Sequence, residues 1–314
     1  MQKFFKKMAA LFAGAILLET PAPARVHTAP APTPEPPLFV DATEDRSLAD
    51  ALRFRVDSEI LHIWFPSVMN ADAAILVCGD DVWMIDCGEK RAALSGAKLL
   101  RQLGITKVSK LFNTHPHHDH LKGLKYIDET AHVEELLFCF PHDATAHIIE
   151  AIEYAEKNSI AVSDYADGDV FSMGNGAVTL KFWCNDDPDL DMNNNSAVTL
   201  IQCGNRRFLF TADIEQPGQE ALLSHVPAKD LRADLLKYPH HGKLALLDTF
   251  YQAVSPLAAV VTNAAVEWDG IRYLDSIGLR TFFTRAGTSC LHFYTDGNIW
   301  VVEQVPLSDI TPEQ

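Results

Sequence analysis

The sequence is poor in basic residues, with 26 lysines and arginines against 42 aspartates and glutamates and a formal net charge of −16. This balance argues against a broad basic face for nucleic acid, because contacts to phosphate depend on lysine and arginine. It disfavours a polyanionic substrate without excluding one. The sequence also shows no internal repeat of about 20–50 residues, so solenoid and propeller folds are not indicated.

Cysteine is also sparse, and its spacing offers no thiolate metal site. The six cysteines include no Cys-x-x-Cys pair, which is the usual spacing of zinc and redox centres. The even number leaves disulfides open as an alternative for an exported chain. Buried free thiols are the simpler interpretation, because several cysteines lie in or beside apolar, strand-like runs. These are Cys78, Cys139, Cys184 and Cys203.

The N-terminus has no apolar run long enough to span a bilayer by itself. Lys3, Lys6 and Lys7 precede a short apolar segment, Met8–Leu18, and small residues follow it. This order is typical of a secretory signal peptide. We therefore expect a signal peptide, or an uncleaved anchor, over residues 1–24. The protein is then exported, either secreted or anchored on the extracytoplasmic side of a bacterial cell, and meets the membrane only through this segment.

The residues after the leader divide into three parts by composition. Proline and alanine dominate the next segment, which predicts an extended linker over residues 25–45. Residues 46–306 are expected to form one catalytic domain, because a chain with 47% hydrophobic residues can build one sizeable core. Residues 307–314 are expected to form a C-terminal tail.

Strand-like and helical runs alternate along the expected domain, which predicts an α/β fold. The expected strands cover residues 73–78, 82–85, 110–113, 136–140, 178–184, 197–203, 208–211, 233–237, 258–262, 281–284, 289–294 and 300–302. The expected helices cover residues 90–103, 144–157, 216–224, 244–253 and 270–277.

One short turn after an apolar run concentrates side chains that suit metals. It holds His115, His117, Asp119 and His120, and imidazole and carboxylate are ligands for zinc, iron and manganese. The His-x-His-x-Asp-His spacing lets one turn serve two metals, with the first two histidines on one side and Asp119 and His120 on the other. A solvated, histidine-rich loop is the alternative interpretation.

Other strand-like runs also end in residues of ligand type. One ends at Asp213, one at the pair His240 and His241, and one at Asp86. Ligands in open α/β sheets gather outside the carboxyl ends of the strands. We therefore expect these side chains to meet the histidine-rich turn in a single metal site.

Together these motifs resemble those of the metallo-β-lactamase superfamily, from about residue 72 to about residue 302. Asn195 and Ser196 before the Asp213 strand, and the run Lys237–Gly242 after it, are most similar to the domain attached to bacterial DNA-uptake channel proteins. The resemblance implies a four-layer αββα sandwich. It also implies a hydrolase with one or two divalent metal ions, which are zinc or else manganese or iron.

The resemblance implies a ligand set as well. The two histidines at the start of the turn bind the first metal, and the other turn residues bind the second together with His240. Asp213 bridges the two metals. In chain order the implied ligands are His115, His117, Asp119, His120, Asp213 and His240. His241 is the alternative to His240, and otherwise it can protonate a leaving oxygen. Asp119 and His241 are accordingly the candidate catalytic residues.

One part of the superfamily pattern is missing, because the first metal lacks its third histidine. Asn195 or Ser196 takes the approximate place, and either is expected to complete the shell weakly or to contact a substrate phosphate. This departure counts against β-lactam and glyoxalase-type thioester hydrolysis. Lys243 is a further candidate phosphate contact, with a solvated lysine as the alternative. Asp86 is expected to order the loops by hydrogen bonds without touching metal.

The sequence therefore predicts a hydrolase that cleaves a small or polymeric phosphodiester with hydroxide generated from metal-bound water. Two alternatives stay open. The same scaffold can hydrolyse a lactone, thioester or amide, because a fold does not fix the substrate. The missing histidine and the acidic surface also fit a non-catalytic binding protein that kept the fold.

Overall fold

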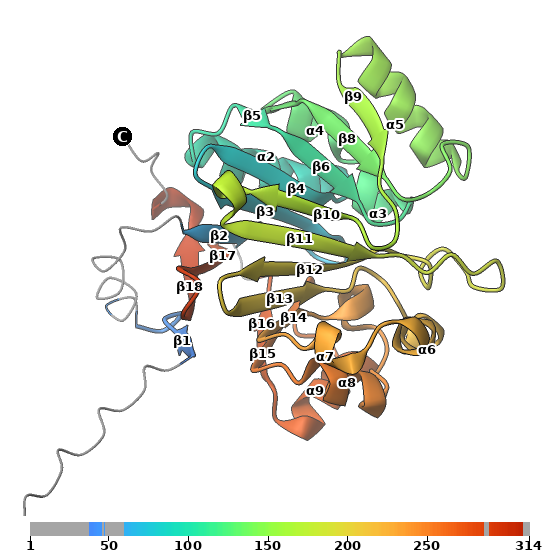
Figure 1. Ribbon diagram of the computed structural model, residues 1–314. Coiled ribbons are helices and arrows are strands. Elements are labelled where there is room, and N and C mark those ends of the chain that lie inside the picture. Colours follow the sequence, from blue (N-terminus) through green and yellow to red (C-terminus); the bar gives the residue numbers. More distant parts are fainter. Residues whose placement is uncertain (1–37, 46, 48–59, 286–288, 310–314) are drawn as a thin grey trace, which may run out of the picture. The chain divides into compact units, whose positions relative to one another are not determined.

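The computed structural model describes residues 38–45, 47, 60–285 and 289–309. The expected signal peptide and most of the expected linker lie outside these residues. Two large β-sheets form the framework of the described part, and helices lie beside each of them (Figure 1). No helix in the described ranges is both long and apolar enough to cross a membrane.

The first sheet has the strand order β1-β18-β17-β2-β3-β4-β6-β8-β9. Strands β2, β3 and β4 pair antiparallel, whereas β4, β6, β8 and β9 run parallel and so end at the same edge. The strands are β1 (Phe39–Asp41), β2 (Leu61–Phe65), β3 (Ala73–Cys78), β4 (Asp81–Cys87), β6 (Lys110–Asn113), β8 (Glu135–Phe138), β9 (Ala161–Asp164), β17 (Ser289–Thr295) and β18 (Trp300–Pro306).

The second sheet runs in sequence order from β10 to β16. Its first four strands are antiparallel, and β13 to β16 are parallel. The strands are β10 (Val170–Met173), β11 (Val178–Trp183), β12 (Val198–Cys203), β13 (Arg206–Phe210), β14 (Leu235–Lys237), β15 (Ala258–Val261) and β16 (Arg280–Phe283). A separate short pair consists of β5 (Lys107–Val108) and β7 (His132–Val133).

Three apolar clusters hold the layers together. The largest lies between the sheets and includes Phe65 and Phe112 from the first and Phe182 and Phe208 from the second. A second cluster packs helices onto the outer face of the first sheet, and a third does so on the second sheet. This is the expected αββα sandwich. The covering helices are α2 (Lys90–Gln102), α4 (Leu124–Asp128) and α5 (Ala146–Lys157) on one side, and α6 (Gln216–His225), α8 (Asp248–Val254) and α9 (Asp269–Ile277) on the other.

The sequence of each element reflects its layer. Strand β15 is covered on both faces, so every residue of its run AAVV is buried. Helix α2 has only one covered side, and its buried residues include Ala93, Ala97 and Leu100 at helical spacing. The pattern of apolar residues thus separates buried strands from surface helices.

The folded part is larger than expected at both ends. Strand β1 pairs in parallel with β18, so the sheet begins inside the segment expected to be linker. Leu307 is buried in a short 3-10 helix, η3 (Leu307–Asp309), inside the expected tail. The expected boundaries at residues 46 and 306 therefore need correction outward, because the sheet edge and the core recruit these flanking residues.

All six cysteines are free thiols, in agreement with the simpler interpretation. Two of the four that were expected to be buried, Cys139 and Cys184, are only half-buried.

Candidate metal centre

The histidine-rich turn follows β6 directly. Strand β6 ends at Asn113, and the short helix α3 (His118–Leu121) begins within the turn. His115 and His120 are fully buried, and Asp119 is only 7% exposed. Such polar groups are buried only when they are paired or bind metal. The buried positions do not fit a solvated loop.

Backbone strain gathers at the same place. The described chain has eight non-glycine residues with positive φ, and several border the centre. They are Asp86 (φ 55°), Ala212 (φ 43°), His240 (φ 48°) and His241 (φ 53°). Each such conformation costs on the order of 1–3 kcal/mol and persists where the surroundings enforce it, most often at functional sites.

Four buried side chains from three loops converge on one point. His120 Nε2 lies 3.3 Å from Asp213 Oδ2, and His241 Nε2 lies 3.4 Å from the same oxygen. His241 Nε2 is also 3.3 Å from Asp119 Oδ2. Tetrahedral ligands at about 2.0–2.2 Å from an ion are separated by roughly 3.3–3.6 Å. We call Asp119, His120, Asp213 and His241 the four-donor group; the three distances above lie in this range, and all four ligand atoms lie within 4.8 Å of one another.

Three atoms of the four-donor group form no hydrogen bond in the described part of the chain. Nε2 of His120 and Nε2 of His241 face Asp213 Oδ2 and are buried with no hydrogen-bond partner among the described residues, as is Asp213 Oδ1, which lies 3.8 Å from Lys237 Nζ. An unpaired buried polar atom costs about 1–3 kcal/mol. A cation at the centre removes this cost, so the residues present fit a divalent metal ion.

The two histidines at the start of the turn lie next to the four-donor group. His115 Nε2 is 4.0 Å from Asp213 Oδ2 and 3.1 Å from His117 Nδ1. Asp213 therefore faces the first histidine of the turn as well as His120 and His241, which is the position a bridging carboxylate needs. His115 and His117 remain a proposal as ligands of a first metal.

The neighbouring residues His240 and His241 take positions that reverse the expected assignment. His240 Nδ1 faces Glu215 Oε1 at 2.7 Å, and its Nε2 faces Lys243 Nζ at 2.7 Å. His240 Nε2 approaches Asp213 Oδ2 to 3.6 Å, but it is His241 that belongs to the four-donor group. We therefore replace His240 by His241 as the proposed ligand of the second metal, and His241 no longer serves as the proton donor.

The segment in place of the third histidine lies beside the turn, because the Ala197 amide donates to Thr114 O at 2.9 Å. The Asn195 side chain is used within its own loop, where its Oδ1 accepts from Asp187 N and its Nδ2 donates to two carbonyl groups. Ser196 is fully buried. The expected metal or substrate contact of Asn195 finds no support in this arrangement, since its amide is already satisfied.

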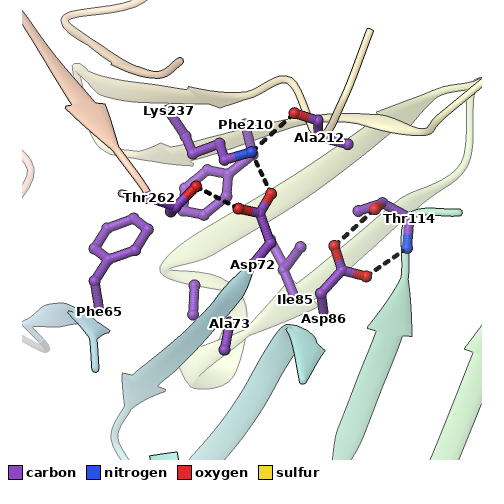
Figure 2. Close-up of a pocket in the computed structure, with 11 residues that line it drawn as sticks. Phe65, Asp72, Ala73, Ile85, Asp86, Thr114, Phe210, Ala212, Lys237 and Thr262 are labelled. Carbon is purple, nitrogen blue, oxygen red and sulfur yellow. Dashed lines mark hydrogen bonds and ion pairs between the residues drawn. The ribbon is translucent and has the colours of Figure 1, made fainter. Parts of the chain in front are cut away.

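Asp86 orders the turn in the way that the sequence suggested. It accepts hydrogen bonds from the Thr114 amide at 2.8 Å and from the Thr114 hydroxyl at 2.7 Å, as Figure 2 shows. Its Oδ2 is also 2.7 Å from His120 Nδ1. Asp86 thus holds both the start of the turn and one imidazole of the four-donor group.

Asp72 is a site residue that the sequence analysis missed. Its carboxylate pairs with the Lys237 ammonium and accepts a hydrogen bond from Thr262 Oγ1 at 2.6 Å (Figure 2). His241 Nδ1 is 3.2 Å from Asp72 Oδ1. The only available signal was a lone carboxylate directly before an apolar strand.

Burial and mutual attraction set the charges of the centre. Burial lowers the pKa of His241, but the carboxylates of Asp213 and Asp72 outweigh it and raise this pKa to about 10. Burial likewise lowers the pKa of His120, but carboxylates, Asp213 first, raise it well above its usual value. Burial prevails at His115 and holds its pKa well below the usual value. Metal binding by His120 and His241 therefore displaces protons, whereas His115 presents a neutral ring.

Residues 70–138 match the family model described as the metallo-beta-lactamase superfamily. The matched segment holds β3, β4, β6, β8 and the histidine-rich turn. This segment of the chain therefore resembles the metallo-β-lactamase superfamily. The αββα architecture and the position of the turn at the carboxyl end of β6 agree with this assignment.

The chain is also similar to part of one curated protein. It is 24% identical over 161 residues to ComE operon protein 3 of Bacillus subtilis (strain 168), and the match covers 51% of this chain but 20% of that protein. The chain therefore spans about a fifth of the length of this relative. The likeness supports the branch of the superfamily that the sequence motifs indicated.

Solved structures align at low sequence identity. The metallo-beta-lactamase fold protein YhfI from Bacillus subtilis has a TM-score of 0.46 and 14% identity, over 71% of this chain and 96% of that chain. CmlA, a diiron beta-hydroxylase from Streptomyces venezuelae, has a TM-score of 0.45 and 14% identity, over 72% of this chain and 52% of that chain.

Proposed function

We propose that the protein is a metal-dependent hydrolase that cleaves a phosphodiester. The four-donor group carries the proposal, because its ligand atoms lie close together and the Nε2 atoms of His120 and His241, which face Asp213 Oδ2, form no hydrogen bond in the described part of the chain. His115 and His117 extend the group toward a second metal. We take the native ion to be zinc, with manganese or iron as alternatives, since imidazole and carboxylate suit all of them.

When the site is loaded, the chemistry that the metal supplies is activation of a water molecule as the nucleophile. The side chains of the protein hold the proposed ligands in position. Asp213 Oδ2 lies within 4.0 Å of four imidazole nitrogens, so one carboxylate oxygen holds the ligand set together. Asp213, His115, His120 and His241 are at most 1% exposed, and burial strengthens each electrostatic contact.

A cation beside the centre favours an anionic ester. Lys243 is half-buried, and its ammonium lies 2.7 Å from His240 Nε2. His240 is held in turn by Glu215 at 2.7 Å. We propose that Lys243 contacts a non-bridging oxygen of the substrate phosphate, which a charge-assisted hydrogen bond stabilises. The neutral carbonyl group of a lactone, thioester or amide is stabilised less by the same ammonium group than a phosphate anion is.

We also propose that the enzyme acts outside the cytoplasm, where the basic and apolar start of the sequence directs it. That segment lies outside the described residues. The proposed substrate is a small or polymeric phosphodiester. The net charge of −16 weighs against a long nucleic acid as substrate, because the protein and the nucleic acid are then both negatively charged.

The test is hydrolysis of bis(p-nitrophenyl) phosphate by the zinc-, manganese- or iron-loaded protein, beside p-nitrophenyl acetate, a lactone, a thioester and an amide. We expect turnover of the phosphodiester that falls at least about 100-fold in Asp213→Ala, because the shared carboxylate is lost. His132→Ala is the matched control, since this exposed imidazole precedes β8 at the strand ends opposite the centre. If the protein hydrolyses only the carboxylic acid derivatives, the substrate is not a phosphodiester and the proposed substrate class is wrong. No turnover of any substrate by metal-loaded protein supports a binding protein.

A further inference from the structure

We propose that Asp72 is the positioning residue of His241, and that Lys237 is the internal counter-charge that keeps Asp72 in place. The inference rests on the metal centre of the proposed function but not on the choice of substrate. It assigns a role to a buried ion pair that the reaction itself does not use.

The first support is the geometry around the His241 ring. Its Nδ1 lies 3.2 Å from Asp72 Oδ1 and 2.9 Å from Thr262 Oγ1. The Thr262 hydroxyl donates to the same carboxylate oxygen at 2.6 Å. With Nδ1 turned to this pair, Nε2 faces Asp119 and Asp213 at 3.3 and 3.4 Å. A ligating histidine typically donates its other ring N–H to a carboxylate, which fixes the tautomer and the orientation of the ring.

The second support is the parallel with the other imidazole of the four-donor group. Asp86 Oδ2 lies 2.7 Å from His120 Nδ1, and His120 Nε2 faces Asp213. Asp72 thus takes the place at His241 that Asp86 takes at His120, at 3.2 Å and through the hydroxyl of Thr262. The two carboxylates come from neighbouring strands of the first sheet, because Asp72 precedes β3 and Asp86 lies near the end of β4.

The third support is the buried cation. Lys237 is 1% exposed, pairs with Asp72 Oδ2, donates to Ala212 O at 2.8 Å and lies 3.8 Å from Asp213 Oδ1. An unpaired buried charge is strongly unfavourable, so Lys237 and Asp72 stabilise each other. Lys237 belongs to the second sheet, whereas Asp72 belongs to the first and donates its backbone amide to Asp119 O at 3.1 Å. The pair therefore joins both sheets directly beneath the centre.

The experiment measures zinc affinity by competition with a chromophoric chelator, together with the visible absorption of the cobalt-loaded protein. Asp72→Asn keeps an oxygen near His241 but leaves the buried Lys237 with only the more distant carboxylate of Asp213, at 3.8 Å, which endangers folding. The double variant Asp72→Asn/Lys237→Met removes both charges and replaces the ammonium by an unbranched apolar side chain. Urea denaturation confirms that it is folded. Asp81→Asn, which removes a carboxylate at the opposite end of β4, is the matched control.

We expect the folded double variant to bind one zinc about 10–100-fold more weakly than wild type and to show an altered cobalt spectrum. If Asp72 and Lys237 have only a structural role, the folded double variant keeps the zinc affinity and the cobalt spectrum of wild type. That result overturns the inference. Wild type that binds no zinc overturns it as well. Wild type that binds zinc but hydrolyses no phosphodiester contradicts the proposed function and leaves this inference standing.

Discussion

His240 and His241 are adjacent in the chain, yet their imidazole rings face different partners. His241 Nε2 points at Asp119 and Asp213, whereas His240 is held between Glu215 and Lys243. Both residues have positive φ, and this backbone turns the two side chains apart. On the proposed assignment, the His241 ring binds the metal and the His240 ring orients the ammonium of Lys243, which is proposed to meet the substrate.

The first prediction concerns this division of roles. His241→Ala should weaken binding of one zinc by more than about 100-fold, because a ligand loss exceeds the 10–100-fold effect of losing an outer partner. His240→Ala should change zinc affinity by less than about tenfold. Chelator competition on both variants measures the difference. Equal losses in the two variants would contradict the assignment of His241 as the ligand.

The second prediction concerns Lys243. Lys243→Met should raise KM for bis(p-nitrophenyl) phosphate about three- to fivefold, since a partly exposed charge pair contributes up to about 1 kcal/mol. Lys243→Arg should stay near wild type. Steady-state kinetics gives the values, with Lys229→Met as the control for loss of an exposed lysine elsewhere. An unchanged KM in Lys243→Met means that the ammonium is only a solvated group.

The third prediction is a pH dependence of the metal-free protein. The pKa of His241 is about 10 in the folded chain against 6.5 for the free group. A raised folded pKa contributes stability that is complete below pH 6.5 and is lost as the pH rises to about 10. The stability advantage of wild type over His241→Gln should therefore shrink across this window, by at most about 1.4 kcal/mol per pH unit. Urea denaturation in chelator-containing buffer measures it, and an advantage that stays constant contradicts the account.

The fourth prediction concerns stabilisation by metal. Zinc that binds the folded chain alone, at 100 times its Kd, should raise the free energy of unfolding by about 2.7 kcal/mol. Thermal denaturation with and without zinc measures the gain. Asp213→Ala should show little of it, because this carboxylate faces every proposed imidazole except His117. If zinc stabilises wild type and Asp213→Ala equally, the zinc binds at a site other than the four-donor group.

Local sequence predicts many of the buried strands of this fold, although the buried strand β2 (Leu61–Phe65) was not expected. The expected strands 73–78 and 110–113 coincide with β3 and β6, because each is an apolar run between polar residues. Strand β9 (Ala161–Asp164) was not expected, since it is an edge strand whose residues are half-buried or exposed. Strand β1 was assigned to the linker, because its pairing with β18 joins opposite ends of the chain.

The residues of the candidate site can likewise be divided into those that local sequence predicts and those that depend on distant contacts. The histidine-rich turn is local in sequence, so its four ligand-type residues could be named in advance. The choice between His240 and His241 depends on backbone conformation and on distant partners, Glu215 and Thr262. The pair of Asp72 with Lys237 forms only when the two sheets pack together. No spacing rule connects residues so far apart.

The most direct test of the account is elemental analysis of purified wild type beside the double variant His115→Ala/His120→Ala. We expect one or two zinc, manganese or iron ions per chain in wild type, and clearly fewer in the variant. Two ions support a site that uses His115 and His117 as well as the four-donor group, and one ion supports the four-donor group alone. Wild type without metal, or equal metal in both proteins, contradicts the proposed metal centre.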